Sequence, residues 1–284
     1  MPGLLHLSDP HFGTEQPDVV EALLALADQV QPEVAVLSGD VTQRARRGQF
    51  ERARRFMQKL QAEAKLVIPG NHDIPLFNLW ARWRAPYGGF QRAFGPDLAP
   101  VYESERYLVL GVNTTRPARH KHGEVSAAQI EAVAQRLRAA SAQQLRVVVT
   151  HQPMAVIRGE DRVNLLRHHR AAAVAWSHAG ADLVLGGHIH LPYACDLRDE
   201  LGLQAPPGWE GVGGGMARAV WVVQAGTALS TRIREGLPNS VNVIHQEPRE
   251  HGCVCKVEQY DYHAGQRRFR PVSGRLLAFP HAAG

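Results

Sequence analysis

Five groups of metal-ligating side chains follow short apolar runs along the sequence. They combine carboxylate, amide and imidazole groups, and three of them have a glycine directly before the polar residues. The groups are Asp9-x-His11, Gly39-Asp40, Gly70-Asn71-His72-Asp73, Thr150-His151 and Gly187-His188-x-His190. A mixed set of oxygen and nitrogen ligands suits Mn, Fe, Co, Ni or Zn better than Ca or Mg. Any one group is common by chance, but the five together predict a transition-metal site.

The apolar runs before these groups have the length of strands, and amphipathic segments of helical period separate them. Strands are expected at 4–7, 34–37, 66–68, 107–112, 146–150 and 183–185, and helices at 18–30, 48–61, 126–140 and 164–178. Ser126 is a suitable N-cap for the third helix. Short strands alternating with helices predict a layered α/β fold. Groups at the carboxyl ends of its parallel strands would converge on one edge, where the glycines permit tight turns and close approach of the backbone.

The pattern changes after His190. Residues 201–215 hold six glycines and two prolines without an apolar period, which predicts a surface loop that is either a lid or filler. Antiparallel strands are expected at 220–224, 241–245, 254–262 and 268–272. Because no repeat or linker is visible, we expect a single domain over 1–284. Within it, 192–219 would be a glycine-rich loop and 220–284 a β-rich C-terminal part.

Composition places the chain among ordinary globular proteins. It has 284 residues, 44% hydrophobic and 21% charged, which excludes collagen, coiled coil and disorder. The N-terminus resembles no signal peptide and no apolar run is long enough for a membrane span, so a cytoplasmic protein is expected. Three cysteines are too few for a disulfide framework. The net charge of +5 is spread along the chain, so a nucleic-acid partner is an alternative that is not favoured.

In order and spacing, the five groups resemble the signature of the calcineurin-like metallophosphoesterases, and the likeness covers residues 4–190. It implies a sandwich of two mixed β-sheets flanked by helices (αββα). Residues 223–227 are similar to the strand that follows the last ligand pair in that family. The segment at 123–129, ahead of a predicted helix, is similar to bacterial class III cyclic-nucleotide phosphodiesterases.

The resemblance implies two divalent metal ions, with Mn, Fe, Zn, Co and Ni as candidates. Asp40 would bridge them, because a carboxylate has two oxygens. The remaining ligands would be Asp9, His11 and His190 for one ion, and Asn71, His151 and His188 for the other. The pair of ions would supply a bridging hydroxide that attacks a phosphoester in line.

Two residues of the third group have an implied catalytic role. His72 would contact the phosphate or protonate the leaving oxygen, and Asp73 would orient its ring. Residues at the rim of the site would bind the substrate phosphate, with Arg44, Arg47 and His122 as candidates.

The expected activity is hydrolysis of a phosphodiester, either a cyclic nucleotide or another small one. Class III phosphodiesterases often have an acidic residue where this chain has Gln43, which weakens the cyclic-nucleotide assignment. Gln43 and Asp73 also argue against the phosphoprotein phosphatases. Alternatives are a phosphomonoesterase, a nuclease, a UDP-diacylglucosamine-type pyrophosphohydrolase and a noncatalytic scaffold. A homodimer remains an open alternative for the oligomeric state.

An aromatic-rich helical segment follows the third group. Its side chains are Trp80, Trp83, Tyr87 and Phe90. Packing against the body of the protein is the simplest expectation for them, and base stacking and lipid binding are the alternatives.

Overall fold

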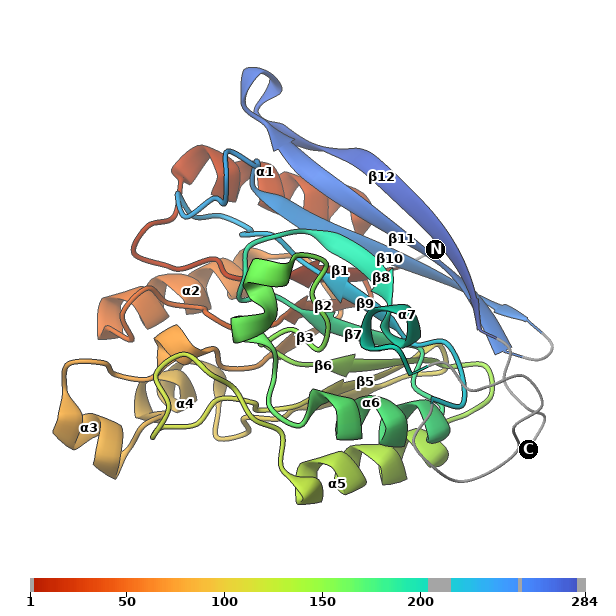
Figure 1. The fold of residues 1–284 in the computed structure, drawn as a ribbon. Helices are drawn as coiled ribbons and strands as arrows, with labels where there is room; N and C mark the ends of the chain where they lie inside the picture. The colour runs from red at the N-terminus through yellow and green to blue at the C-terminus, as the bar shows by residue number, and fades with distance from the viewer. Residues whose placement is uncertain (1–2, 204–215, 250–251, 280–284) are drawn as a thin grey trace.

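The computed structural model describes residues 3–203, 216–249 and 252–279, and their strands form two mixed six-stranded sheets (Figure 1). The first sheet has the order β12-β11-β10-β1-β2-β3. Its strands are β1 (Leu4–Leu7), β2 (Val34–Leu37), β3 (Ala64–Val67), β10 (Ser240–Arg249), β11 (Gly252–His263) and β12 (Arg268–Phe279). The second sheet has the order β4-β5-β6-β7-β9-β8. Its strands are β4 (Val101–Glu103), β5 (Tyr107–Gly111), β6 (Leu145–Val149), β7 (Leu183–Gly186), β8 (Tyr193–Asp196) and β9 (Trp221–Gln224).

Helices cover the outer face of each sheet and produce four layers. The helices are α1 (Pro17–Val30), α2 (Arg47–Lys59), α3 (Leu79–Arg84), α4 (Gly88–Phe94), α5 (Ala127–Arg138), α6 (His169–His178) and α7 (Leu197–Leu201). Short 3-10 turns lie at η1 (Asn71–Asp73), η2 (Gly159–Asn164) and η3 (Ala264–Gln266). One apolar cluster joins α1, α2 and α4 to the first sheet, and another joins α5, α6 and α7 to the second. Within the described ranges, no helix has both the length and the apolar character needed to cross a membrane.

The central strands are apolar on both faces because each face is covered. In β1, Leu5 and Leu7 pack toward the helices, whereas Leu4 belongs to the cluster between the two sheets. In β6, Val148 faces the helices, and Val147 and Val149 face the other sheet. Side chains that alternate between two buried faces explain why these strands read as continuous apolar runs.

Parallel pairing sets one common edge in each sheet. Strands β1, β2 and β3 are parallel, as are β5, β6, β7 and β9. Their carboxyl ends therefore lie side by side, so that short loops following them can share one site.

The predicted α/β sandwich is confirmed, and most elements begin or end within a few residues of their predicted bounds. The predicted cap is also present, since the Ser126 hydroxyl accepts a hydrogen bond from the Gln129 backbone nitrogen at 3.2 Å. The prediction of a loop over 192–219 is wrong in its first part. Strand β8 pairs with β9 there and α7 follows, because Cys195, Leu197 and Leu201 supply apolar contacts to the second core. Residues 204–215 lie outside the described residues.

The aromatic segment after η1 does not pack as a unit. Phe90 of α4 is buried and Tyr87 donates a hydrogen bond to the Thr115 carbonyl oxygen, as packing residues do. Trp80 and Trp83 of α3, however, are 71% and 79% exposed. The expectation of packing is therefore wrong for the two tryptophans.

Candidate metal centre

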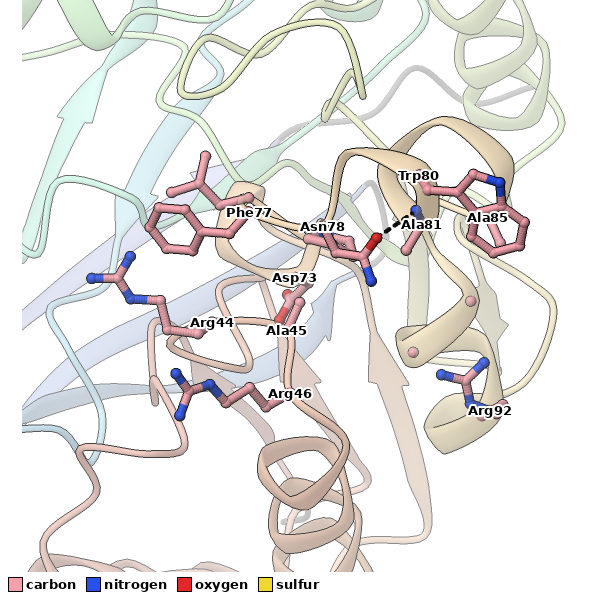
Figure 2. Close-up of a pocket in the computed structure, with 14 residues that line it drawn as sticks. Arg44, Ala45, Arg46, Asp73, Phe77, Asn78, Trp80, Ala81, Ala85 and Arg92 are labelled. Atoms are coloured by element: carbon pink, nitrogen blue, oxygen red, sulfur yellow. Dashed lines mark hydrogen bonds between the residues drawn. The ribbon is translucent and has the colours of Figure 1, made fainter.

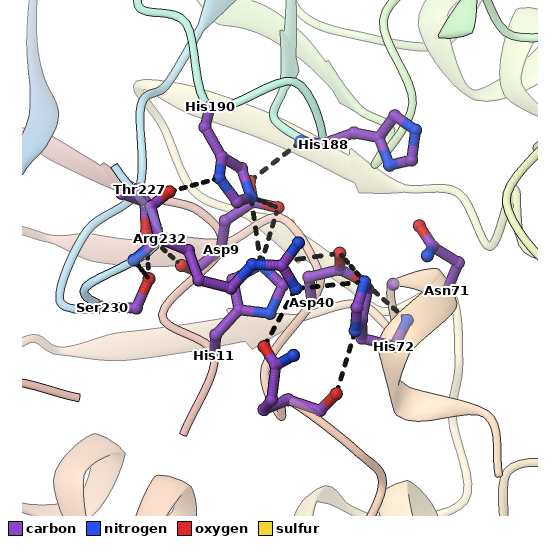
Figure 3. A network of polar contacts seen from close by, with 12 residues as sticks. Asp9, His11, Asp40, Asn71, His72, His188, His190, Thr227, Ser230 and Arg232 are labelled. Carbon is purple, nitrogen blue, oxygen red and sulfur yellow. Dashed lines mark hydrogen bonds and ion pairs between the residues drawn. The ribbon is translucent and has the colours of Figure 1, made fainter. Parts of the chain in front are cut away.

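The five predicted groups meet at the carboxyl edge of both sheets. Three follow β1, β2 and β3 of the first sheet, and two follow β6 and β7 of the second. Figure 3 shows six of the predicted ligands converging from these loops: Asp9, His11, Asp40, Asn71, His188 and His190. His151, the seventh, contacts Asn71 through Nε2 at 3.2 Å.

One group of ligand atoms surrounds the carboxylate that follows β1. Asp9 Oδ1 lies 3.3 Å from His190 Nε2 and 3.8 Å from His11 Nε2. The two imidazole Nε2 atoms are themselves 3.0 Å apart. Two ring nitrogens and one carboxylate oxygen that point at a common centre match the donor set of a divalent transition metal.

A second group surrounds the carboxylate that follows β2. Asp40 Oδ1 lies 3.2 Å from His151 Nε2, and ligand atoms of Asp40, His151 and His188 all lie within 4.8 Å of one another. The other oxygen, Asp40 Oδ2, is 3.8 Å from His11 Nε2 in the first group. Asp40 thus faces both groups, as the predicted bridging role requires.

Several buried polar atoms of this site lack a hydrogen-bond partner among the described residues. They include Asp9 Oδ1 and both ring nitrogens of His188. A buried polar atom without a partner is costly unless it binds something else, and a carboxylate oxygen beside imidazole nitrogens would bind a cation. The residues therefore fit the implied pair of metal ions.

Protonation states favour ligation at most positions. Burial lowers the pKa of His11 and of His188 to about 3, so both rings are neutral and offer a lone pair. Burial would raise the pKa of Asp40, but the neighbouring histidines, His151 first among them, hold it well below its usual range. His151 and His190 are the exceptions. Burial acts to lower the pKa of His151, but Asp40 outweighs this and raises it to about 9. Burial also acts to lower the pKa of His190, but the neighbouring Asp9 outweighs this and raises it.

Backbone carbonyl groups fix two of the histidine rings. His151 Nδ1 donates to the Ser38 carbonyl oxygen at 2.9 Å, and His190 Nδ1 donates to that of Arg232 at 2.6 Å. Since Nδ1 carries the proton in each ring, the neutral form of the ring presents its lone pair on Nε2 toward the site.

The loops that carry the ligands have an unusual backbone conformation. Five of the seven predicted ligands have positive φ angles, namely Asp9 (51°), His11 (42°), Asp40 (45°), His188 (73°) and His190 (56°). The left-handed region is unfavourable for residues with a side chain, and such residues gather at functional sites.

Two of the glycines that directly precede the ligand groups are needed for close approach between these loops. A Cβ atom on Gly70 would collide with the backbone and carboxylate of Asp40, and one on Gly187 would collide with Ser8 and with the carboxylate of Asp9. The expectation that glycine permits the loops to come close is confirmed at both positions.

His72 is placed beside the bridging carboxylate, but a different residue orients it from the one predicted. Its Nε2 lies 4.0 Å from Asp40 Oδ2, and its Nδ1 donates to the Gln43 carbonyl oxygen at 2.9 Å. Asp73 accepts hydrogen bonds instead from the backbone nitrogens of Val41, Thr42 and Gly70 and from the Thr42 hydroxyl, at 2.8–3.0 Å. The predicted role of Asp73 in orienting His72 is therefore wrong, because these buried backbone donors already occupy its carboxylate.

Arg232 is a site residue that the sequence did not single out. Its guanidinium lies 3.0 Å from Gln43 Oε1 and 3.5 Å from His72 Nε2. With Asn71, Arg44 and His120 it lines a cavity of about 350 Å³ at the mouth of the centre. Its position in the fold could have indicated a site residue. Arg232 lies in the loop after β9, and β9 is the parallel strand beside β7, which precedes His188 and His190.

Of the three predicted substrate contacts, Arg44 lies at the cavity beside His72, and Arg47 and His122 do not. Arg44 lines the cavity that contains His72. Arg47 pairs instead with Glu51 at 2.8 Å on the exposed side of α2, because one helical turn separates them. His122 is exposed and lines none of the described cavities, whereas His120 lines two of them at the centre.

A four-layer sandwich with a shared carboxylate between two His/Asp groups at its strand ends defines a metallophosphoesterase centre. A family model for calcineurin-like phosphoesterases matches residues 3–192, and the chain belongs to this family.

Two curated relatives are bacterial phosphodiesterases. The chain is 27% identical over 163 residues to a probable cyclic nucleotide phosphodiesterase of Synechococcus, covering 57% of this chain and 59% of that protein. It is 25% identical over 206 residues to a cAMP/cGMP dual specificity phosphodiesterase of Mycobacterium tuberculosis, covering 66% and 61%. The chain thus spans about three fifths of each relative's length.

Among solved structures, a purple acid phosphatase from yellow lupin seeds has the same fold. It matches with a TM-score of 0.64 over 98% of this chain and 53% of that one, at 11% identity.

Proposed function

We propose that this protein is a metal-dependent phosphodiesterase that hydrolyses a small phosphodiester, with cyclic nucleotides as the first candidates. The observation that carries the proposal is Asp40, whose carboxylate faces His151 with one oxygen and His11 with the other. The similarity to two bacterial cyclic nucleotide phosphodiesterases supports the diester substrate.

The proposed ligands are Asp9, His11 and His190 for one ion and Asn71, His151 and His188 for the other, with Asp40 shared. Bound divalent ions would lower the pKa of a water molecule and neutralise phosphoryl oxygens. Mn, Fe, Zn, Co and Ni all suit this donor set.

The protein's own groups would bind the phosphate and handle the proton of the leaving oxygen. His72 presents Nε2 to the cavity, because Gln43 holds its Nδ1. A protonated His72 would donate from Nε2 to the leaving oxygen. Arg232, beside that nitrogen, carries a permanent positive charge that suits a non-bridging phosphate oxygen.

Hydrolysis of bis(p-nitrophenyl) phosphate and p-nitrophenyl phosphate by metal-free protein given Mn²⁺ tests the proposal. Both substrates release the same leaving group, so the ratio of the two rates reports diester against monoester chemistry. We expect a diester preference, followed by activity on cyclic AMP. A monoester preference would indicate a phosphomonoesterase. If neither substrate is cleaved and elemental analysis finds no metal, a noncatalytic scaffold would replace the proposal.

A further inference from the structure

Helix α3 exposes apolar side chains that a surface helix usually buries. An ordinary surface helix buries its apolar side chains and exposes its charged ones. In α3 no residue is buried, and Leu79, Trp80 and Trp83 are 72%, 71% and 79% exposed. Phe77, just before the helix, is 79% exposed as well. We call Phe77, Leu79, Trp80 and Trp83 the aromatic knob.

A charged side chain, rather than an apolar one, attaches α3 to the body of the protein. Arg82 donates to the carbonyl oxygens of Pro117 at 2.7 Å, Pro75 at 3.2 Å and Arg119 at 3.2 Å. These contacts hold the inner side of the helix to the loop at 116–119. The knob therefore faces outward on an anchored helix, and Figure 1 shows α3 at the periphery of the molecule.

The surface around the knob is basic. Arg84 lies on α3, and Arg46 and Arg92 line the adjoining pocket together with Trp80 (Figure 2). None of these three arginines makes an ion pair with a carboxylate of the described chain. Arg44, in the same pocket, lies over the ring of Phe77 at 5.4 Å.

We propose that the aromatic knob docks this protein on an anionic lipid bilayer. Tryptophan and phenylalanine are favoured at the level of the lipid headgroups, where their rings are partly buried, and nearby guanidinium groups pair with lipid phosphates. Unpaired arginines beside exposed rings fit both parts of such a surface. Because Arg44 also lines the cavity containing His72, docking would bring the mouth of the metal centre close to the bilayer.

Co-sedimentation with vesicles tests the proposal on the full chain. Vesicles of phosphatidylcholine with 30% phosphatidylglycerol would be compared with pure phosphatidylcholine. We expect the protein to bind the anionic vesicles, the double variant Trp80→Ser/Trp83→Ser to bind at least tenfold more weakly, and Arg84→Glu to bind several-fold more weakly. High salt would reduce binding of the wild type, because it screens the arginines.

Leu276→Ser is the matched control. Leu276 lies on β12 and is 72% exposed, like Leu79, so its loss removes exposed apolar surface away from the knob. Vesicle binding should be unchanged in this variant. All variants alter exposed side chains, and circular dichroism would verify that each is folded.

Two results would overturn the proposal. The first is wild-type protein that stays in the supernatant with anionic vesicles, and the second is undiminished binding by the double variant. After the first result, analytical ultracentrifugation and binding of a single-stranded oligonucleotide would show whether the wild type forms a dimer or a nucleic-acid complex that the double variant loses. The knob would then be a protein or nucleic-acid contact. Hydrolysis of a soluble diester should be equal in wild type and double variant, so failure of docking is distinguishable from failure of the proposed function.

Discussion

The guanidinium of Arg232 lies 3.5 Å from Nε2 of His72, although 160 residues separate them in the sequence. The backbone carbonyl of the same arginine accepts the Nδ1 proton of His190 at 2.6 Å. Arg232 therefore connects the mouth of the site to a proposed metal ligand through two different parts of one residue. The side chain and the backbone contact can be separated by mutation.

Replacing Arg232 by alanine should lower kcat/KM for a diester by about 10- to 100-fold, because a charge-assisted contact to phosphate contributes about 1.5–3 kcal/mol. Metal content should not change, since the carbonyl that holds His190 is retained. Steady-state kinetics and elemental analysis measure the two effects. Arg158→Ala is a suitable control, because Arg158 pairs with the exposed Glu235. A wild-type rate in Arg232→Ala would exclude a role in phosphate binding.

Substitution of Asp40 and of His72 should have different consequences. Asp40→Ala removes the carboxylate that faces both ligand groups, so metal content and activity should fall together. His72→Ala should keep the metal and lose about 10²–10⁴-fold in rate, as expected for loss of a general acid. Elemental analysis of both purified variants checks this. Equal metal loss in the two would show that His72 is a ligand.

Metal affinity should rise with pH. The pKa of His151 in the metal-free protein is raised to about 9, chiefly by Asp40 against the opposing effect of burial, so below pH 9 its ring carries a proton that a metal must displace. Affinity should therefore increase up to about tenfold per pH unit between pH 6.5 and 8. Calorimetric titration with Mn²⁺ in buffers of different ionisation enthalpy would detect the released proton. An affinity independent of pH over that range would contradict the assignment.

Replacing Asp73 by alanine should destabilise the fold by about 3 kcal/mol, because it leaves buried backbone N–H groups without an acceptor. The loops after β2 and β3 would lose their common contact, so activity should fall as well. Urea denaturation measures the free energy of unfolding. Asp28→Ala, on the exposed side of α1, is the control and should leave it unchanged. Unaltered stability in Asp73→Ala would mean that water replaces the carboxylate.

Strand periodicity and the residues after each strand predicted a layered α/β fold and the convergence of the ligand groups. The sandwich of two sheets was implied by the resemblance to the calcineurin-like metallophosphoesterases. Local pattern could not predict contacts set by the tertiary structure. Asp73 sits next to His72 in sequence, yet backbone donors from two loops occupy it. Arg47 follows Asp40 closely, yet the helix turns it toward Glu51.

The local pattern also led to a wrong prediction of burial in α3. Aromatic residues such as Trp80 and Trp83 are typical of a packed segment, but both are exposed, and Arg82 makes the contact with the body of the protein instead. Arg232 was not predicted because its loop contains no ligand group, although it follows the segment at 223–227. The loop after β9 of the second sheet brings Arg232 to His72, which follows β3 of the first sheet.

The positive φ angles at five of the proposed ligands imply that the geometry of the metal site lowers the stability of the fold. At about 1 kcal/mol each, these conformations would together cost about 5 kcal/mol, which is similar to the whole net stability of a marginal domain. Glycine at these positions would relieve the backbone and remove the ligands. A variant of this chain with glycine at these positions should therefore be more stable than the natural protein but inactive. The natural protein, in turn, should tolerate few further destabilising mutations.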